Sequence, residues 1–309
     1  MFAILTSILP IFLTIALGHV LRRGGIPSVE FWNLNDKLVY WVLMPCLMFN
    51  KVSLAELGQD ALGAYAGSIL GGFAVAVVFA LLIGRAMGYQ APQATSILQG
   101  AARHNSFIAL ALAANLYGAQ GFETAILASA ILIPVTNVVV VVLMVVALQP
   151  GKRSSLPLAI LRDLLRNPHI ISISLALLAN RFIGQEIPVL HEMTALLGGA
   201  ALPITLLAVG ANLRIRAMAA SLAPVSLAFL GKMFVFPLAT LLIGLAVGLP
   251  EQLLEIAVIY GLVPTGVTAY TLARQLGGDA PLMAAIVTLQ TLAALITIPL
   301  SLMVLMPLL

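Results

Sequence analysis

The sequence predicts an all-α integral membrane protein, with ten transmembrane helices arranged as two inverted repeats of five. Hydrophobic residues make up 61% of its 309 residues and charged residues only 8%, with a mean hydropathy of +1.11. Soluble domains carry about 25% charged residues, so this composition excludes an ordinary soluble domain. Apolar runs of the ~20 residues that cross a bilayer core follow one another along nearly the whole chain. Helix-breaking and polar residues also recur at matching places in the two halves.

These matching places define the two repeats. Pro45 precedes Asn105 by 60 residues, and Pro203 precedes Pro264 by 61. Five is an odd number of helices, so the second copy enters the bilayer upside down, which is the inverted arrangement of many secondary transporters. We therefore expect a first repeat at 1–148, a connector at 149–167 and a second repeat at 168–309.

The first repeat contains five apolar segments. The first segment ends at the pair Arg22 and Arg23, the second is short and carries Pro45, and the fourth has polar residues at its middle. The fifth carries Pro134 and Asn137 near its middle. In order, the expected spans are 3–21, 34–50, 62–84, 94–117 and 122–148.

The second repeat also has five apolar segments, and four of them carry an internal proline: Pro203, Pro237, Pro264 and Pro299. Each proline removes a backbone donor and tends to kink its helix. In lipid, the carbonyls freed in this way must find partners in neighbouring helices, side chains or a hydrated cavity. The expected spans are 168–185, 190–212, 222–248, 252–276 and 281–307.

A row of glycines lies on the third segment. Gly63, Gly67 and Gly71 recur every four residues and so present a flat face of one helix. Small residues at this spacing let helix backbones approach closely in membranes. We expect this face to pack within the chain; a homodimer contact or a sliding surface is the alternative.

Positively charged residues gather on one side of the ten-span topology. That side holds Arg22, Arg23, Lys37, Arg85, Lys152, Arg153, Arg162, Arg166, Arg214, Arg216 and Arg274, whereas the other holds Lys51 and Arg181. Loops rich in Lys and Arg stay in the cytoplasm, so both termini are expected outside, in a multi-pass protein of the plasma membrane (the inner membrane of a bacterium). The basic loops are explained by topology and the lipid bilayer, and they do not indicate a nucleic acid partner.

Polar residues gather near the middle of the fourth and ninth segments, where a polar side chain is costly in lipid. Helix breaks at these places would aim the N-terminal ends of half-helices into the membrane, and such ends suit an anion. The expected substrate ligands are Asn105, Ser106, Thr265 and Thr268, beside Pro264. The alternative is a pair of kinked helices whose polar side chains satisfy their own backbone.

Two cationic side chains also lie at membrane depth, Arg103 in the fourth segment and Lys232 in the eighth. Burying either one costs at least about 2.5–3.5 kcal/mol. All Asp and Glu residues fall in loops or end turns of the expected spans, so an anionic substrate would supply the missing counter-ion. Both cations are therefore expected to bind substrate; the alternative is that they reach the interface or bond to backbone carbonyls.

Three further polar residues at depth are candidates for coupling transport to an ion. A free histidine side chain titrates near neutral pH, so His104 is a candidate proton carrier, whereas Asn137 and Gln290 serve either coupling or helix–helix contacts. The sequence has no HExxH motif and no zinc-type spacing, so no metal, cofactor or enzymatic activity is expected. Ser106 beside His104 is a weak basis for an intramembrane enzyme, because residues two apart face different directions on a helix.

Four stretches carry a resemblance to a known family: LPIFLTIALGHVLRRGGIP, KLVYWVLMPCLMF, ALPITLLAVGANLRI and VPTGVTAYTLARQLG. In their order and spacing the chain resembles, over essentially its whole length, the auxin efflux carrier family in its bacterial form. The resemblance implies crossed fourth and ninth helices, and a scaffold of helices one, two, six and seven against which the others move. It also implies an organic anion as substrate, such as auxin in plants or dicarboxylates like malonate in bacteria.

The chain departs from the family after the polar cluster of the fourth segment. Family members commonly have Gly and then Pro there, whereas Ala109 and Ala111 occupy these places. Alanine is the best helix former, so the break in this helix is expected to be milder or displaced.

Together these features predict a secondary transporter, for efflux or uptake, of a small organic anion such as a mono- or dicarboxylate. It would work by alternating access around a crossover site at the middle of the membrane. The alternatives are a sodium- or proton-coupled symporter resembling the bile acid symporters, a channel, and a membrane sensor that binds its ligand without moving it.

Overall fold

The computed structural model describes all residues except 1, 56–61, 150–161, 163, 216–221 and 306–309. The described residues form helices joined by short connections, with no strand among them. Most of the connector expected at 149–167 lies outside the described residues, as do Glu56, Asp60, Lys152, Arg153 and Arg216.

Seven helical elements make up the first half of the chain. They are α1 (Phe2–Arg23), α2 (Val29–Leu38), η1 (Val39–Leu43), α3 (Met44–Val52), α4 (Leu62–Ala86), α5 (Ala91–Ala102) and α6 (Ser106–Leu148). α2, η1 and α3 follow one another directly, so the second expected span is one helix that begins earlier than predicted. Within α6, Gly118 has a non-helical backbone with φ 66° and ψ −150°. This glycine separates the fourth expected span from the fifth.

The second half contains eight helical elements among its described residues. They are α8 (Pro168–Phe182), α9 (Leu190–Ala211), α10 (Leu222–Leu230), η4 (Gly231–Val235), α11 (Phe236–Ala246), α12 (Glu251–Leu262), α13 (Thr268–Leu276) and α14 (Ala280–Leu305). The Asn167 side chain starts α8 by accepting hydrogen bonds from the N–H groups of His169 and Ile170, as helix-capping asparagines do.

The prolines of the second and eighth spans are both accommodated by a π-helical turn. A single π-helical turn lies just before each one: η1 precedes Pro45, and η4 precedes Pro237. Proline cannot donate to the carbonyl four residues earlier, and a π turn absorbs this mismatch by changing the hydrogen-bond spacing. Both helices therefore continue through their proline.

The helices form a multi-pass membrane protein. Five of them are long and apolar enough to cross a membrane among the described residues: Leu62–Ala86, Ala91–Leu148, Leu190–Ala211, Leu222–Ala246 and Ala280–Val304. Large apolar side chains are exposed along their outer faces, for example Leu82, Leu196 and Ile296. Exposed apolar surface of this extent is a liability in water and suits contact with lipid.

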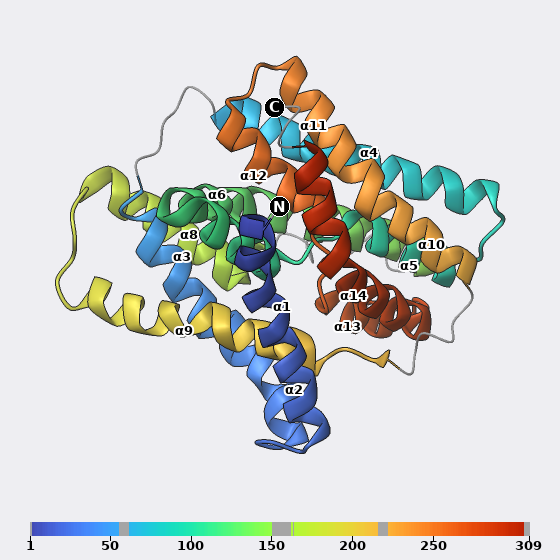
Figure 1. Cartoon of the computed structure of the whole chain (residues 1–309), viewed down its shortest axis with the longest axis horizontal. Coiled ribbons are helices and arrows are strands. Elements are labelled where there is room, and N and C mark those ends of the chain that lie inside the picture. The colour runs from blue at the N-terminus through green and yellow to red at the C-terminus, as the bar shows by residue number, and fades with distance from the viewer. Residues whose placement is uncertain (1, 56–61, 150–161, 163, 216–221, 306–309) are drawn as a thin grey trace.

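The helices pack as two groups, seen as blue and yellow ribbons and as cyan, orange and red ribbons in Figure 1. The α9 group consists of α1, α2, α3, α8 and α9, and the α12 group consists of α4, α5, α10, α11, α12, α13 and α14. α6 contacts both groups. The α9 group contains the first, second, sixth and seventh expected spans, the set that the resemblance names as a scaffold.

Glycines allow backbone contact within each group. A Cβ atom on Gly210 of α9 would lie 1.6 Å from the carbonyl oxygen of Ile15 in α1, so only glycine fits. Similarly, Gly72 of α4 lies against Thr240 of α11. The expected packing of the glycine row on α4 holds for Gly71, which abuts Ile243, whereas Gly63 and Gly67 face open space.

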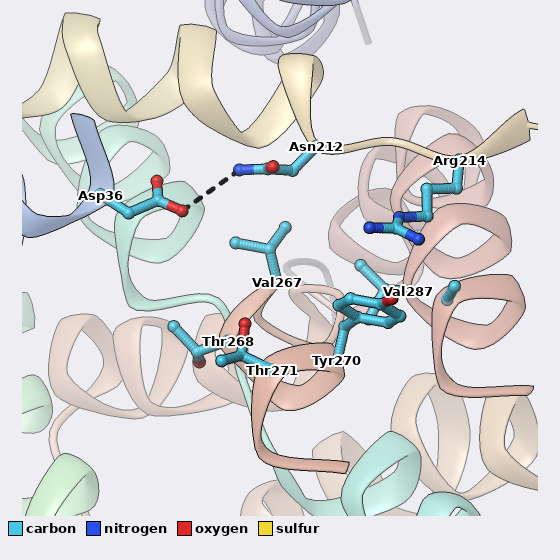
Figure 2. Close-up of a pocket in the computed structure, with 9 residues that line it drawn as sticks. Asp36, Asn212, Arg214, Val267, Thr268, Tyr270, Thr271 and Val287 are labelled. Carbon is cyan, nitrogen blue, oxygen red and sulfur yellow. Dashed lines mark hydrogen bonds between the residues drawn. The ribbon is translucent and has the colours of Figure 1, made fainter. Parts of the chain in front are cut away.

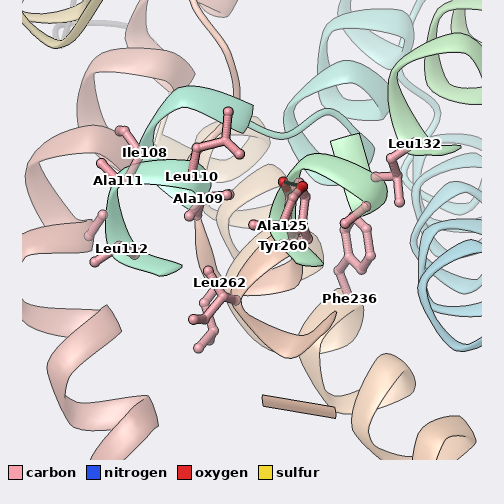
Figure 3. Packing of buried hydrophobic residues seen from close by; sticks show 14 of the residues in the cluster. Ile108, Ala109, Leu110, Ala111, Leu112, Ala125, Leu132, Phe236, Tyr260 and Leu262 are labelled. Carbon is pink, nitrogen blue, oxygen red and sulfur yellow. Dashed lines mark hydrogen bonds between the residues drawn. The ribbon is translucent and has the colours of Figure 1, made fainter. Parts of the chain in front are cut away.

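The interior of the α12 group surrounds the middle of α12. Figure 3 shows Tyr260 and Leu262 of α12 among Ala125 of α6, Phe236 of α11 and the first turns of α6. The Tyr260 hydroxyl donates to the Ala125 carbonyl oxygen and also bonds the Ser129 hydroxyl at 2.6 Å. The polar end of a buried tyrosine is thereby satisfied.

Candidate functional site at two helix breaks

The fourth and ninth spans are both broken, each near its polar cluster. The second break has a local cause in Pro264, because the residue before a proline is pushed out of the helical region; Val263 is extended, with ψ 147°. The first break has no proline. Instead, Asn105 begins α6, its side-chain oxygen accepting hydrogen bonds from the N–H groups of Phe107 and Ile108 at 3.1 and 3.3 Å. Asparagine is among the best residues for this role.

Ala109 and Ala111 are helical and buried in α6, downstream of this break. The non-helical residues 103–105 lie between α5 and α6. The departure from the family pattern therefore leaves the fourth span broken, at the asparagine rather than at the alanines.

The two breaks lie against each other and satisfy each other's backbone. The Asn105 N–H donates to the Pro264 carbonyl oxygen at 2.8 Å. The Thr265 hydroxyl donates to the Gly100 carbonyl oxygen, also at 2.8 Å. A Cβ on Gly266 would lie 3.1 Å from the His104 carbonyl oxygen, which shows how closely the chains approach. Backbone groups left open at a membrane-depth break need such partners.

Gln290 of α14 holds both breaks at once. Its side-chain oxygen accepts from the Thr265 N–H at 2.9 Å, and its amide nitrogen donates to the Gly100 carbonyl at 2.8 Å. The same nitrogen lies 3.2 Å from the Ala228 carbonyl. Gln290 is fully buried, so its amide bridges α5, α10 and the break that follows α12.

Lys232 stabilises the end of α12, just before the second break. Pro264 cannot donate a hydrogen bond to the carbonyl four residues before it, which belongs to Tyr260. The Lys232 ammonium donates to this carbonyl at 2.9 Å and lies 4.2 Å from the centre of the Phe236 ring. The side chain is 0% exposed. The sequence left two roles open for Lys232, binding substrate or bonding to a backbone carbonyl. In this conformation Lys232 bonds to a backbone carbonyl.

Arg103 reaches across from the first break to the start of α13. One guanidinium nitrogen donates to the Thr268 hydroxyl at 3.2 Å. Its other terminal nitrogen is buried and has no hydrogen-bond partner within the described chain. Both ring nitrogens of His104 are likewise buried without a partner there, and the ring lies edge-on to Tyr260, 5.6 Å between centroids. Unsatisfied polar groups at this depth are costly.

A cavity of about 60 Å³ opens beside α13, between the two helix groups (Figure 2). That volume admits a few water molecules or a carboxylate-sized group. Its walls come from α2 and the end of α9 on one side and from α13 and α14 on the other. The lining residues are Asp36, Asn212, Arg214, Val267, Thr268, Tyr270, Thr271, Ala284 and Val287.

Figure 2 shows how the polar side chains of this cavity are held. The Arg214 guanidinium stacks over the Tyr270 ring, 4.0 Å from its centre, an attractive cation–π arrangement. The Asn212 amide donates to an Asp36 oxygen at 3.4 Å and accepts from Arg22 at 3.0 Å. The wall at the end of α9 therefore carries both a fixed arginine and a fixed amide, and the α13 wall faces them.

The predicted site residues divide into three sets. Thr268 lines the cavity, and Arg103 bonds directly to it. A second set lies at or next to the breaks and does not line this cavity: Asn105, Ser106, Pro264, Thr265, His104 and Gln290. Lys232 stands behind α12, and Asn137 is half-buried on α6.

Sequence reasoning missed the opposite wall of the cavity. Asn212 and Arg214 lie in the ALPITLLAVGANLRI stretch, where Arg214 was counted only as a loop charge. Asp36 carried no signal of its own. An Asn-x-Arg sequence directly after an apolar span is the feature that could have marked this wall. Its proximity to α13 is set by packing between distant segments.

The described residues contain no group of three or more His, Cys, Asp and Glu side chains placed to hold a metal ion.

Comparison with known proteins identifies one match. A family model described as "Membrane transport protein" matches residues 3–302, nearly the whole chain. No curated protein matches the chain.

Proposed function

The chain belongs to the auxin efflux carrier-like family of membrane transport proteins, and from this premise we propose that it is a secondary transporter of a small organic anion. The substrate class is a mono- or dicarboxylate, and the mechanism is alternating access. The observation that carries the proposal is the cavity beside α13, where Arg214 faces a helix break between two packed groups of helices.

The chemistry of the cavity favours an anion. Arg214 offers a planar set of donors that matches a carboxylate. Arg103 adds a second positive charge through its bond to Thr268. The first turn of α13 begins at this wall, and no side chain caps it, whereas α6 is capped by Asn105. The positive end of the α13 dipole is therefore left for a ligand.

The position of the cavity supports alternating access. Asp36, Asn212 and Arg214 belong to the α9 group or its flanking turn, whereas Thr268 and Tyr270 belong to the α12 group. A shift of one group against the other would open or close the space between these walls. We propose that the α9 group is the scaffold and that the α12 group moves.

The proposed topology has ten spans in two inverted repeats. In support, the elements of each half run in the same order: two helices, a third long helix, a broken helix, then a last long helix. The excess of Lys and Arg on one side favours a plasma-membrane protein with both termini outside. In this orientation the cavity opens toward the cytoplasm, because it lies beside Arg214.

Asn105, Ser106 and Thr265 take a defined part in this mechanism. Their groups are buried between the breaks in this conformation, so they would meet substrate only when the breaks separate. Lys232 would act through the Tyr260 carbonyl, by holding the end of α12 in place.

Uptake by purified protein in liposomes tests the proposal. Arg214→Gln removes the charge from the cavity, and we expect labelled carboxylate uptake to fall about tenfold or more, since a hydrogen bond to a charged group contributes about 1.5–3 kcal/mol. Arg274→Gln is the matched control, because Arg274 is an exposed arginine of α13, the helix on the facing wall, and lies outside the cavity. Equal uptake by the two variants would contradict the proposed site.

Proton coupling is the second candidate, and His104 favours it. Its two ring nitrogens lie beside the breaks without a partner in the described chain, so they could exchange a proton when the breaks move. An imposed pH gradient should then accelerate uptake by the wild type but not by His104→Asn. Equal acceleration of both proteins would remove His104 from the coupling.

A further inference from the structure

A second cavity, of about 310 Å³, adjoins the first at the ends of α1 and α9. Three arginines and a histidine line it, together with the start of α2. The complete lining is His19, Arg22, Arg23, Val29, Ala211, Asn212, Leu213 and Arg214. Asn212 and Arg214 are shared with the cavity beside α13. We call this second cavity the basic pocket.

We propose that the basic pocket binds the phosphate headgroup of an anionic phospholipid. Arg22 and Arg23 end α1, where cations also complement the helix dipole. His19 precedes them by one turn, so all three lie near the same end of the helix and line the pocket. Basic pockets between transmembrane helices on the cytoplasmic side are suited to anionic headgroups. The arginines supply donors for the phosphate oxygens.

The surface beside the pocket favours a lipid over a soluble anion. Leu9, Leu13, Val20 and Arg23 lie at helical spacing on one face of α1. Leu13 is 59% and Val20 63% exposed, so this face offers an apolar track that ends at a basic side chain. Val29 continues the apolar surface and lines the pocket itself, 46% exposed. A phospholipid has this combination of acyl chains and a charged head, whereas inorganic phosphate or a short carboxylate has only the charge.

The shared residues give the lipid a consequence for the transport cavity. Arg22 donates to Asn212 at 3.0 Å, and Asn212 in turn bonds Asp36 in the wall of the first cavity. A phosphate at Arg22 competes with Asn212 for the same guanidinium. The bound lipid therefore repositions one wall of the cavity beside α13.

Native mass spectrometry of the detergent-purified chain tests the lipid site without any transport assay. The protein is offered phosphatidylglycerol and phosphatidylcholine with identical acyl chains. We expect preferential retention of phosphatidylglycerol, and an apparent affinity about fivefold weaker in Arg23→Gln, since one basic residue near an anionic surface is worth about 1 kcal/mol. Arg23 is exposed, so this variant loses charge and not packing.

Arg85→Gln is the control, because Arg85 is also an exposed arginine at the end of a helix but lies outside both cavities. It should retain phosphatidylglycerol as the wild type does. The inference is overturned if both lipids bind equally, or if Arg85→Gln weakens binding as much as Arg23→Gln. It is also overturned if inorganic phosphate alone displaces the lipid, which would indicate a pocket for a soluble anion. Because the readout is lipid retention, failure here leaves the transport proposal untouched.

Discussion

At Tyr260 the main chain of α12 lacks the hydrogen bond that the next turn of a helix would supply, because Pro264 has no N–H. Lys232 replaces that donor with a side chain from η4, and the ammonium is fully buried. A buried charge is costly unless it is paired or hydrogen-bonded. The lysine and the proline are therefore expected to depend on each other, which a double-mutant cycle can measure.

We predict that Lys232→Met lowers the melting temperature of the detergent-solubilised protein more in the wild type than in a Pro264→Ala background. In the wild type the substitution leaves a buried carbonyl without a donor, at a cost of about 1–3 kcal/mol. Alanine at 264 restores an N–H that can serve this carbonyl when α12 extends by a turn. If Lys232→Met shifts the melting temperature equally in both backgrounds, the lysine does not compensate for the proline.

At the scale of elements, each broken span owes its break to a different residue. Pro264 ends α12 because a proline and the residue before it are incompatible with a continuing helix. Asn105 starts α6 by capping its first N–H groups. The first break is thus made by a capping preference rather than by a helix breaker, and it should be sensitive to the chemistry of one side chain.

We predict that Asn105→Ala and Asn105→Asp separate stability from transport. Alanine removes the cap and should destabilise the protein by about 0.5–2 kcal/mol. Aspartate keeps an accepting oxygen at the favourable end of the α6 dipole, so the melting temperature should hold. Its negative charge beside the breaks should nevertheless repel an anion and reduce carboxylate uptake. Normal uptake by the stable aspartate variant would argue that the substrate never approaches the breaks.

Across the whole molecule, the sequence was sufficient for those features that depend on local chemistry. Hydropathy predicted which segments are apolar enough to span a membrane. Pro264 and the polar cluster around Asn105 predicted where two of these segments break. The sequence predicted the ends of the helices less accurately. For example, the helix expected at 34–50 runs from Val29 to Val52 through a π turn.

The contacts between distant segments could not be read in the same way. Lys232 carried a charge at membrane depth, which suggested substrate binding, and its bond to Tyr260 depends on how η4 packs on α12. Arg214 resembled any other loop arginine until the fold placed it over Tyr270. In both cases the role is set by a neighbour that periodicity and composition do not specify.

We propose that two helix groups move around an anion held beside α13, and counterflow in liposomes is the direct test of this movement. Liposomes containing the protein are loaded with an unlabelled carboxylate, and the entry of the labelled anion is followed over time. Alternating access predicts saturable entry that is accelerated by the anion inside, in the wild type and in Arg274→Gln but not in Arg214→Gln. Entry that does not saturate and ignores the internal anion would indicate a channel, and binding without entry of any mono- or dicarboxylate would indicate a sensor. Either result would contradict alternating access around this cavity.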